Sequence, residues 1–242
     1  MLFVFAITAR GLEPVAADEM EAAGLRVEET GYRRVRAACQ GPLAPLLGLR
    51  TVDDLFLQVE TWLGVDRPRS ALDTIRLMSS RLNLYIAAAV CGDLRPIRRP
   101  PVFSVTASFV GRRNYSADEI KLACAEGVKQ AHYGWTYTPD DREADLNVRL
   151  FIEQETAYVG VRLAAEPLQN RPYKEAHIPG SLKPPVAAAL GWLAGVRGGG
   201  GGTRLVDPCC GAGTILIEAA RGGARAVGGD PDRIAPSALA AR

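Results

Sequence analysis

The sequence predicts an α+β N-terminal region followed by the beginning of an α/β domain. Short strand-like and helix-like patterns follow one another from residue 2 to residue 163. A strand, a glycine turn, a helix and a second strand then occupy residues 203–230. Two breaks separate these parts: the proline-rich, basic RPIRRPP at 95–101 and the polar connector EPLQNRPYKEAHIP at 166–179.

The first part, residues 1–94, has the element order of a ferredoxin-like domain. The expected elements, in order, are a strand at 2–8, a helix at 11–24, two short strands within 26–39, a helical turn at 42–48, a strand at 52–63 and a helix capped by Ser70. The basic side chains of Arg33, Arg34 and Arg36 are expected to form a solvated face, because Arg is seldom buried. No catalytic pattern is recognisable in this part.

The second part, residues 102–165, begins with a strand in which polar and apolar residues alternate. Val102–Val110 is therefore expected to bury one face only. Ser116 and Glu119 form an S-x-x-E capping box, which predicts the start of a helix. Two further alternating segments are expected to pair as strands, at 144–150 and 157–163.

Residues 203–230 have the pattern of a half-site for a nucleoside cofactor. A short apolar strand ends at Asp207, the turn PCCGAG follows, and Thr214 opens an apolar helix. Glycines in such a turn allow backbone angles and close ligand approach that a Cβ would block. A second strand ends at Asp230, about 20 residues beyond the glycines, where a carboxylate meets a ribose hydroxyl in nucleotide-binding βαβ units.

The residue types in this loop discriminate between possible cofactors. A dinucleotide loop needs a third small residue in G-x-G-x-x-G, and Leu216 stands at that position. This disfavours a nucleotide-dependent oxidoreductase. A phosphate loop needs a Lys that the sequence lacks here. An Asp before the glycines suits a ligand with an ammonium group and no phosphate, so S-adenosylmethionine fits best, and a glycine turn in some other βαβ unit is the alternative.

The segment DPCCGAGTILIEAA resembles the first motif of the THUMP-containing RNA guanine N2-methyltransferases. The segment HIPGSLKPPVAAALGWLAG, at 177–195, resembles the stretch that leads into their methyltransferase domain, and Val102–Leu163 resembles their THUMP module. The resemblance implies a ferredoxin-like domain at 1–94, a THUMP RNA-binding module at 102–165, a linker at 166–180 and the first part of a Rossmann-like methyltransferase domain at 181–242.

The resemblance also implies a reaction and a set of site residues. The expected reaction transfers the methyl group of S-adenosylmethionine to the exocyclic N2 of a guanine in RNA, with tRNA favoured over rRNA. The cofactor-binding candidates are Asp207, Pro208, Cys209, Gly211, Ala212, Gly213, Thr214, Asp230 and Ser181. For Ser181 an N-cap role is the alternative. The RNA-binding candidates are Arg112, Arg113, Lys121 and Lys129.

One motif of such enzymes is missing. Methyltransferases that act on amino groups in this way carry a later [ND]-P-P-[YF] tetrapeptide, which holds the amine and stacks the extruded base. The chain has two Pro-Pro pairs, in RPPV at 99–102 and KPPV at 183–186. Their flanking residues do not match the tetrapeptide, and neither pair lies after the glycine turn. Since about 40 residues follow the glycines where a doubly wound domain needs on the order of 150, we expect a truncated methyltransferase domain. No catalytic residue is assigned.

These departures leave two functional hypotheses. In the first, the chain is expected to be inactive alone, because it is a natural gene remnant, a split enzyme that a second chain completes, or part of a longer sequence. The alternative is a non-catalytic RNA-binding protein that uses the THUMP module. In either case the partner is RNA.

Composition bounds these hypotheses further. The chain has 242 residues, of which 48% are apolar. Its formal net charge is only +2, so the net charge does not by itself predict a nucleic-acid-binding protein. Its five cysteines form no zinc-binding pattern, which indicates a reduced cytoplasmic protein without a metal. The apolar N-terminal run is too short to span a membrane, so no membrane contact is expected.

Overall fold

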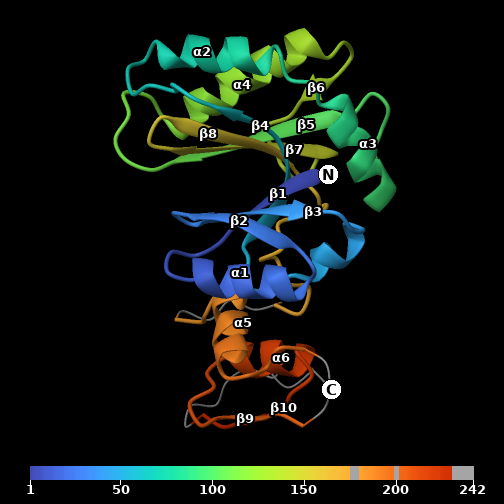
Figure 1. Cartoon of the computed structure of the whole chain (residues 1–242), viewed down its shortest axis with the longest axis vertical. Helices are drawn as coiled ribbons and strands as arrows, with labels where there is room; N and C mark the ends of the chain where they lie inside the picture. Colours follow the sequence, from blue (N-terminus) through green and yellow to red (C-terminus); the bar gives the residue numbers. More distant parts are fainter. Residues whose placement is uncertain (175–179, 199–201, 231–242) are drawn as a thin grey trace. The chain divides into compact units, whose positions relative to one another are not determined.

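The computed structural model describes residues 1–174, 180–198 and 202–230. The chain divides into two compact units, each assembled from separate stretches of sequence (Figure 1). The first comprises Met1–Phe5, Ala38–Ala44 and Leu55–Glu166, and the second Ala6–Ala37, Pro45–Asp54 and Pro167–Arg242. Compactness thus groups residues 55–94 with residues 102–165, although the sequence placed a boundary between them. The predicted domain bounds stay a prediction.

The first unit is built on a sheet of parallel and antiparallel strands in the order β1-β4-β8-β7-β5-β6. The strands are β1 (Leu2–Ile7), β4 (Asp54–Trp62), β5 (Val102–Phe109), β6 (Thr136–Tyr137), β7 (Leu146–Glu153) and β8 (Thr156–Arg162). Strand β5 pairs in parallel with β6 and β7, whereas β8 is antiparallel to both β7 and β4. The predicted pairing of the two segments after residue 144 is confirmed.

Helices α2 (Ala71–Ser79) and α4 (Ala117–Ala131) cover one face of this sheet, and α3 (Tyr85–Leu94) lies at its end (Figure 1). Their close packing requires Gly127, because a Cβ there would overlap the carbonyl oxygen of Arg76 on α2. The capping box predicted at the start of α4 is present, with the Ser116 side chain and the Glu119 carboxylate each bonded to the other's backbone N–H. The contact at Gly127 therefore sets how closely α2 and α4 pack, and the capping box sets where α4 begins.

Two predictions for the first unit are wrong. Ser70 does not cap α2 with its side chain, because it has the helical angles φ −58° and ψ −22° and its hydroxyl makes no capping bond. Strand β5 buries residues on both faces, because Ser104 is only 2% exposed. Its hydroxyl donates to Asp141 Oδ1 at 2.6 Å and accepts from Asn147 Nδ2 at 2.9 Å. A polar network therefore covers the face expected to meet solvent.

The second unit contains the N-terminal helix and the predicted cofactor half-site. Its elements are α1 (Glu13–Ala22), β2 (Arg26–Gly31), most of β3 (Arg34–Cys39), the short 3₁₀ helix η1 (Ala44–Gly48), α5 (Pro184–Leu193), β9 (Arg204–Asp207), α6 (Thr214–Arg221) and β10 (Arg225–Gly228). Strands β9 and β10 pair in parallel, with Leu205 opposite Ala226. Helix α6 packs on both strands and against α5. The predicted order of strand, turn, helix and strand is confirmed.

The expected solvated face of Arg33, Arg34 and Arg36 is also incorrect in part. The side chain of Arg34 is fully buried. Its Nη2 donates to Glu29 Oε1 at 2.5 Å and its Nη1 to Glu29 Oε2 at 3.3 Å, so a bidentate pair compensates the buried charge. No helix in the described parts of the chain is long and apolar enough to cross a membrane.

Candidate functional site

The glycine turn before α6 has an open backbone conformation. Gly213, the N-cap of α6, is left-handed at φ 74° and ψ 13°, and Gly211 also has a positive φ of 51°. A hydrogen bond of 2.7 Å from Gly213 N to Cys210 O closes the turn. The first N–H groups of any helix lack an intrahelical acceptor, and within the described residues no side-chain cap is present at the start of α6. They remain available to an anionic group of a ligand.

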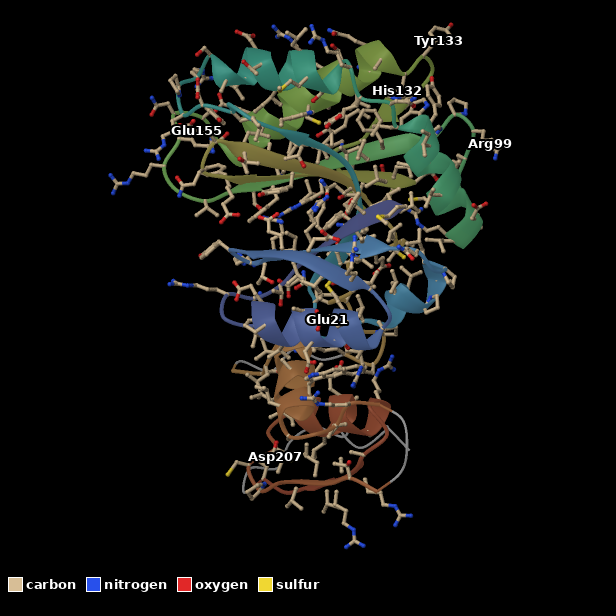
Figure 2. All side chains as sticks on the ribbon, viewed as in Figure 1. Glu21, Arg99, His132, Tyr133, Glu155 and Asp207 are labelled. Carbon is tan, nitrogen blue, oxygen red and sulfur yellow. The ribbon has the colours of Figure 1, made fainter. Side chains whose placement is uncertain are left out.

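The two predicted acidic positions meet at this turn. Figure 2 shows Asp207 where β9 ends. Its Oδ1 accepts from Cys209 N at 3.1 Å, and its carbonyl oxygen accepts from Gly229 N at 3.1 Å. Asp230 Oδ2 accepts from Gly211 N at 2.8 Å. The strand ends and the turn therefore form one hydrogen-bonded loop with two half-buried carboxylates.

The backbone at the end of β10 lies close to the end of β9 and to the glycine turn. A Cβ on Gly228, at the end of β10, would lie 2.7 Å from Asp207 O and 3.0 Å from Cys210 Cβ. Cys210 is half-buried, and its burial together with Asp207 and Asp230 raises the pKa of its thiol. Cys209 is exposed. Pro208 and Ala212 belong to the same turn.

Ser181 lies beside the start of α6. Its Oγ is 3.4 Å from the hydroxyl of the buried Thr214. The alternative role of Ser181 as an N-cap is wrong, because α5 begins after Lys183, which has the extended angles φ −67° and ψ 139°. The structure therefore brings Ser181 to the predicted loop. Asp232, the next carboxylate after Asp230 in the sequence, lies outside the described residues.

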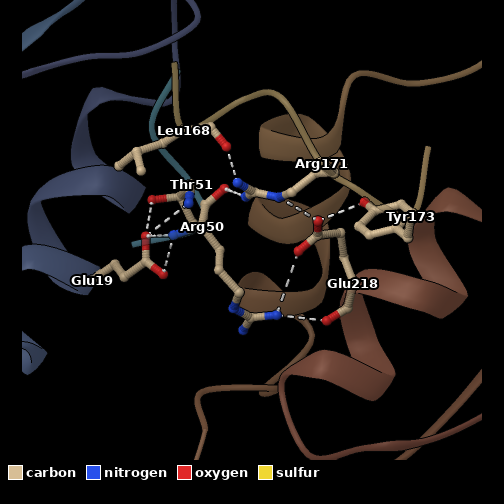
Figure 3. Close-up of polar contacts among 7 residues, drawn as sticks. All are labelled: Glu19, Arg50, Thr51, Leu168, Arg171, Tyr173 and Glu218. Carbon is tan, nitrogen blue, oxygen red and sulfur yellow. Dashed lines mark hydrogen bonds and ion pairs between the residues drawn. The ribbon is translucent and has the colours of Figure 1, made fainter. Parts of the chain in front are cut away.

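A buried acid on α6 was not predicted as a site residue. Glu218 is fully buried, and its Oε1 accepts from Arg171 Nε at 2.9 Å and from the Tyr173 hydroxyl at 2.6 Å (Figure 3). Its Oε2 lies 3.7 Å from Arg50 Nη1, which also donates to the Glu218 carbonyl oxygen at 2.5 Å. We call these four residues the Glu218 cluster. Burial, and then its bond to Glu218, raise the pKa of Tyr173.

The Glu218 cluster extends into the N-terminal part of the second unit. Arg171 Nη2 donates to Arg50 O at 2.9 Å. Glu19 on α1 accepts from Arg50 N at 2.9 Å, from Thr51 N at 2.8 Å and from the Thr51 hydroxyl at 2.6 Å (Figure 3). Helix α6 is thus tied to a segment about 170 residues earlier in the chain. The sequence signal for Glu218 is a lone acid within the apolar run TILIEAA.

The predicted RNA contacts differ in availability. Arg113 donates to the carbonyl oxygens of Val65, Asp66 and Gln154 and to the Tyr115 hydroxyl, so its guanidinium organises the loop. Lys121 pairs with Asp118 at 2.8 Å. Arg112 and Lys129 are exposed, and their side chains form no hydrogen bond or ion pair with any residue that the structure describes. Whether these four bind RNA stays a prediction.

Comparisons with known proteins agree with the predicted family. Residues 171–233 match the model of UPF0020, the RMKL-like methyltransferase domain. The chain is 28% identical over 226 residues to a ribosomal RNA large subunit methyltransferase K/L of Syntrophotalea carbinolica, covering 89% of this chain and 29% of the relative. It is 31% identical over 225 residues to a tRNA (guanine(6)-N2)-methyltransferase of Thermus thermophilus, covering 90% of this chain and 61% of the relative. The chain therefore spans less than two thirds of either relative.

Solved structures have a similar fold. TrmN from Thermus thermophilus superimposes with a TM-score of 0.70 at 28% identity, covering 96% of this chain and 66% of that one. A putative methyltransferase complexed with SAH gives a TM-score of 0.64 at 20% identity, covering 92% of this chain and 55% of that one, which supports the fold alone. The match at 171–233 contains the glycine turn, α6 and Asp230, whose geometry is described above. This segment of the chain is therefore similar to the RMKL-like methyltransferase domain of UPF0020.

Proposed function

We propose that this chain binds S-adenosylmethionine at the turn between β9 and α6. The observation that carries the proposal is the hydrogen bond from Gly211 N to Asp230 Oδ2, which joins the glycine turn to the end of β10. The groups present match the cofactor. A carboxylate suits an ammonium group or a ribose hydroxyl, and the uncapped N–H groups of α6 suit a carboxylate.

Within this proposal each residue has a defined task. Asp207 holds the ammonium group of the methionine part, and Asp230 accepts from the ribose. Gly211 and Gly213 leave room for the ligand, and Ser181 with Thr214 lines the side of the turn. The cofactor supplies a methyl group already activated on its sulfonium, so the protein's task is to align donor and acceptor.

We further propose that the acceptor is the exocyclic N2 of a guanine in RNA, with tRNA favoured over rRNA. Support comes from the relative that this chain covers to 61%, which is a tRNA (guanine(6)-N2)-methyltransferase, against 29% for the rRNA enzyme. The 242 residues contain no [ND]-P-P-[YF] tetrapeptide. We therefore propose that they bind the cofactor without turnover unless other residues supply the amine-binding step.

A second function is favoured by the same missing motif. In it the chain is a non-catalytic RNA-binding protein that uses the THUMP module. The two functions separate experimentally, because this alternative requires RNA binding but no cofactor binding.

The test is calorimetric titration of S-adenosylmethionine into the purified chain, with a thermal melt and a methylation assay on unmodified tRNA. We expect micromolar binding, a raised melting temperature and no turnover. Asp230→Asn should weaken binding about tenfold, the effect of losing a charged hydrogen-bond acceptor. Asp118→Asn, an exposed acid on α4, is the matched control and should bind normally.

Two results would overturn parts of the proposal. A folded chain that binds no S-adenosylmethionine while still binding tRNA would support the non-catalytic alternative. Robust methylation of tRNA by the 242 residues alone would refute the need for a further amine-binding segment.

A further inference from the structure

The first unit contains an aromatic pocket of about 420 Å³ that no predicted site residue lines. It lies between α3, the segment 97–101 that precedes β5, and residues 133–135 after α4. Figure 2 shows Arg99, His132 and Tyr133 at this end of the unit, with Glu155 at the opposite end. Its volume is in the range of pockets that hold small ligands, roughly 300–1,000 Å³.

One wall of the pocket contains Tyr85 and Trp135, whose rings pack against the buried ring of His132. The ring of Tyr85 lies 4.9 Å from that of His132 and 5.7 Å from that of Trp135, measured between centroids. His132 Nε2 accepts from Leu84 N at 3.0 Å, and its other ring nitrogen bonds Val128 O at 3.0 Å. Burial lowers the pKa of His132, which keeps this ring neutral. Hydrogen bonds therefore fix the His132 ring, against which the Tyr85 and Trp135 rings pack.

The pocket lining also includes an aromatic side chain exposed to water. Tyr133 is 97% exposed, whereas Tyr85 is 54% exposed and Trp135 is buried. Small residues of α3 also line the pocket: Ala88, Ala89 and Gly92. These small side chains leave room for a flat ligand next to the Tyr85 ring. An exposed aromatic at the edge of such a pocket is a common contact for a stacking ligand.

The charge of the pocket is positive. Its lining includes Arg98 and Arg99 but no acidic side chain. Arg98 Nε donates to both oxygens of Asp145, at 2.9 and 2.8 Å, and its Nη2 donates to Glu143 O at 2.5 Å. Arg99 makes no hydrogen bond or ion pair within the described residues, so its charge is available. By contrast, the cavity between α2 and α4 is lined by arginines and acids together.

We propose that this pocket binds an unpaired nucleotide of RNA. The base stacks on the aromatic side chains, and Arg99 contacts a phosphate. Proteins recognise single-stranded RNA by this combination of aromatic faces and a basic group. The inference rests on the proposed function, which makes RNA the substrate. An uncharged or proline-rich peptide would leave Arg99 without a counter-charge, so the observations favour RNA.

The pocket is separate from the predicted RNA contacts. Strand β5 starts at Val102, next to the pocket, and ends at Phe109, before the turn that carries Arg112 and Arg113. A strand of this length extends roughly 25 Å. An RNA that reaches both places therefore has to span several nucleotides. Binding at the pocket can be tested without changing the other end of the strand.

The test compares two pocket variants with two surface controls in the full chain. Affinity is measured by the anisotropy of unmodified tRNA and of a single-stranded RNA hexamer carrying 2-aminopurine, whose fluorescence also reports stacking. Tyr133→Ala should weaken hexamer binding about tenfold and abolish the quenching, since stacking on one aromatic has an effect of this size. Arg99→Gln should lower the salt slope by about 0.7, the value for one phosphate of a single strand. Leu77→Ala and Arg81→Gln change exposed residues on and after α2 and should bind like the wild type.

Each other outcome contradicts a defined claim. If the wild type binds tRNA but both pocket variants bind equally well, the pocket proposal fails and the proposed function stands. If the wild type binds no RNA while S-adenosylmethionine still binds, RNA as the substrate fails, and the pocket with it. If a proline-rich peptide binds in a Tyr133-dependent way and the hexamer does not, the pocket belongs to a protein partner and the RNA proposal is overturned.

Discussion

The change Glu218→Gln tests whether the Glu218 cluster holds α6 in place. The carboxylate accepts hydrogen bonds of 2.9 Å from Arg171 and 2.6 Å from Tyr173, and Arg50 lies 3.7 Å from its second oxygen. That oxygen is buried and takes no hydrogen bond from the described residues. Breaking a buried ion pair by removing one partner costs about 3–5 kcal/mol. Because Gln keeps the shape and one acceptor oxygen, we expect the lower end, about 3 kcal/mol.

The assay is amide hydrogen exchange of α6, which reports local opening of this helix. A loss of about 3 kcal/mol corresponds to roughly hundredfold faster exchange, since 1.36 kcal/mol is one factor of ten. Glu126→Gln is the matched control. It makes the same chemical change on α4, where the side chain is 61% exposed and also lies 3.7 Å from an arginine, so exchange should not change. Wild-type exchange of α6 in Glu218→Gln would refute the reasoning.

Three other outcomes can be measured on the same chain. The exposed Cys209 should react with a maleimide faster than Cys124, whose burial raises its pKa to about 12. S-adenosylmethionine should protect Cys209 from this labelling. Labelling that the cofactor leaves unchanged would argue against a ligand at the turn. Gly228→Ala should weaken calorimetric cofactor binding at least about tenfold, because its Cβ would lie 2.7 Å from a carbonyl oxygen, whereas Gly229→Ala meets nothing within 4 Å and should bind normally. The stability contribution of neutral His132 should be complete above about pH 6.5 and be lost as pH falls through its lowered pKa; urea titrations should show this loss, and His132→Gln should flatten it.

The parts of the fold that the sequence predicts are those fixed by short-range physics. The glycines at 211 and 213 predict the turn, and the structure gives both a positive φ. The S-x-x-E motif predicts the capping box at α4, whose two hydrogen bonds join residues only three apart in the sequence. Parallel pairing of β9 and β10 follows from the strand, helix and strand order. In each case the deciding contacts lie within about 25 residues.

The predictions that failed depended on partners far along the chain or on the details of one side chain. Ser104 is buried because Asn147, 43 residues away, bonds its hydroxyl. Arg34 is buried because Glu29 pairs with it across two strands, a partner that a basic cluster in sequence does not reveal. Ser70 has the residue type of a cap, but its backbone is already helical. The serine at position 70 therefore predicted the start of α2 correctly, although its side chain makes no capping hydrogen bond.

The Glu218 cluster also shows why the cofactor half-site is hard to delimit from sequence. The sequence places the beginning of the methyltransferase domain at residue 181, after the connector. Yet Arg171 and Tyr173, within that connector, bond the buried carboxylate of α6, and Arg50 bonds its backbone. A fragment beginning at residue 181 would keep the glycine turn but leave Glu218 as a buried charge without these partners, which is strongly unfavourable. The physical unit that supports the turn is therefore the discontinuous second unit, and the first helix of the chain is part of it.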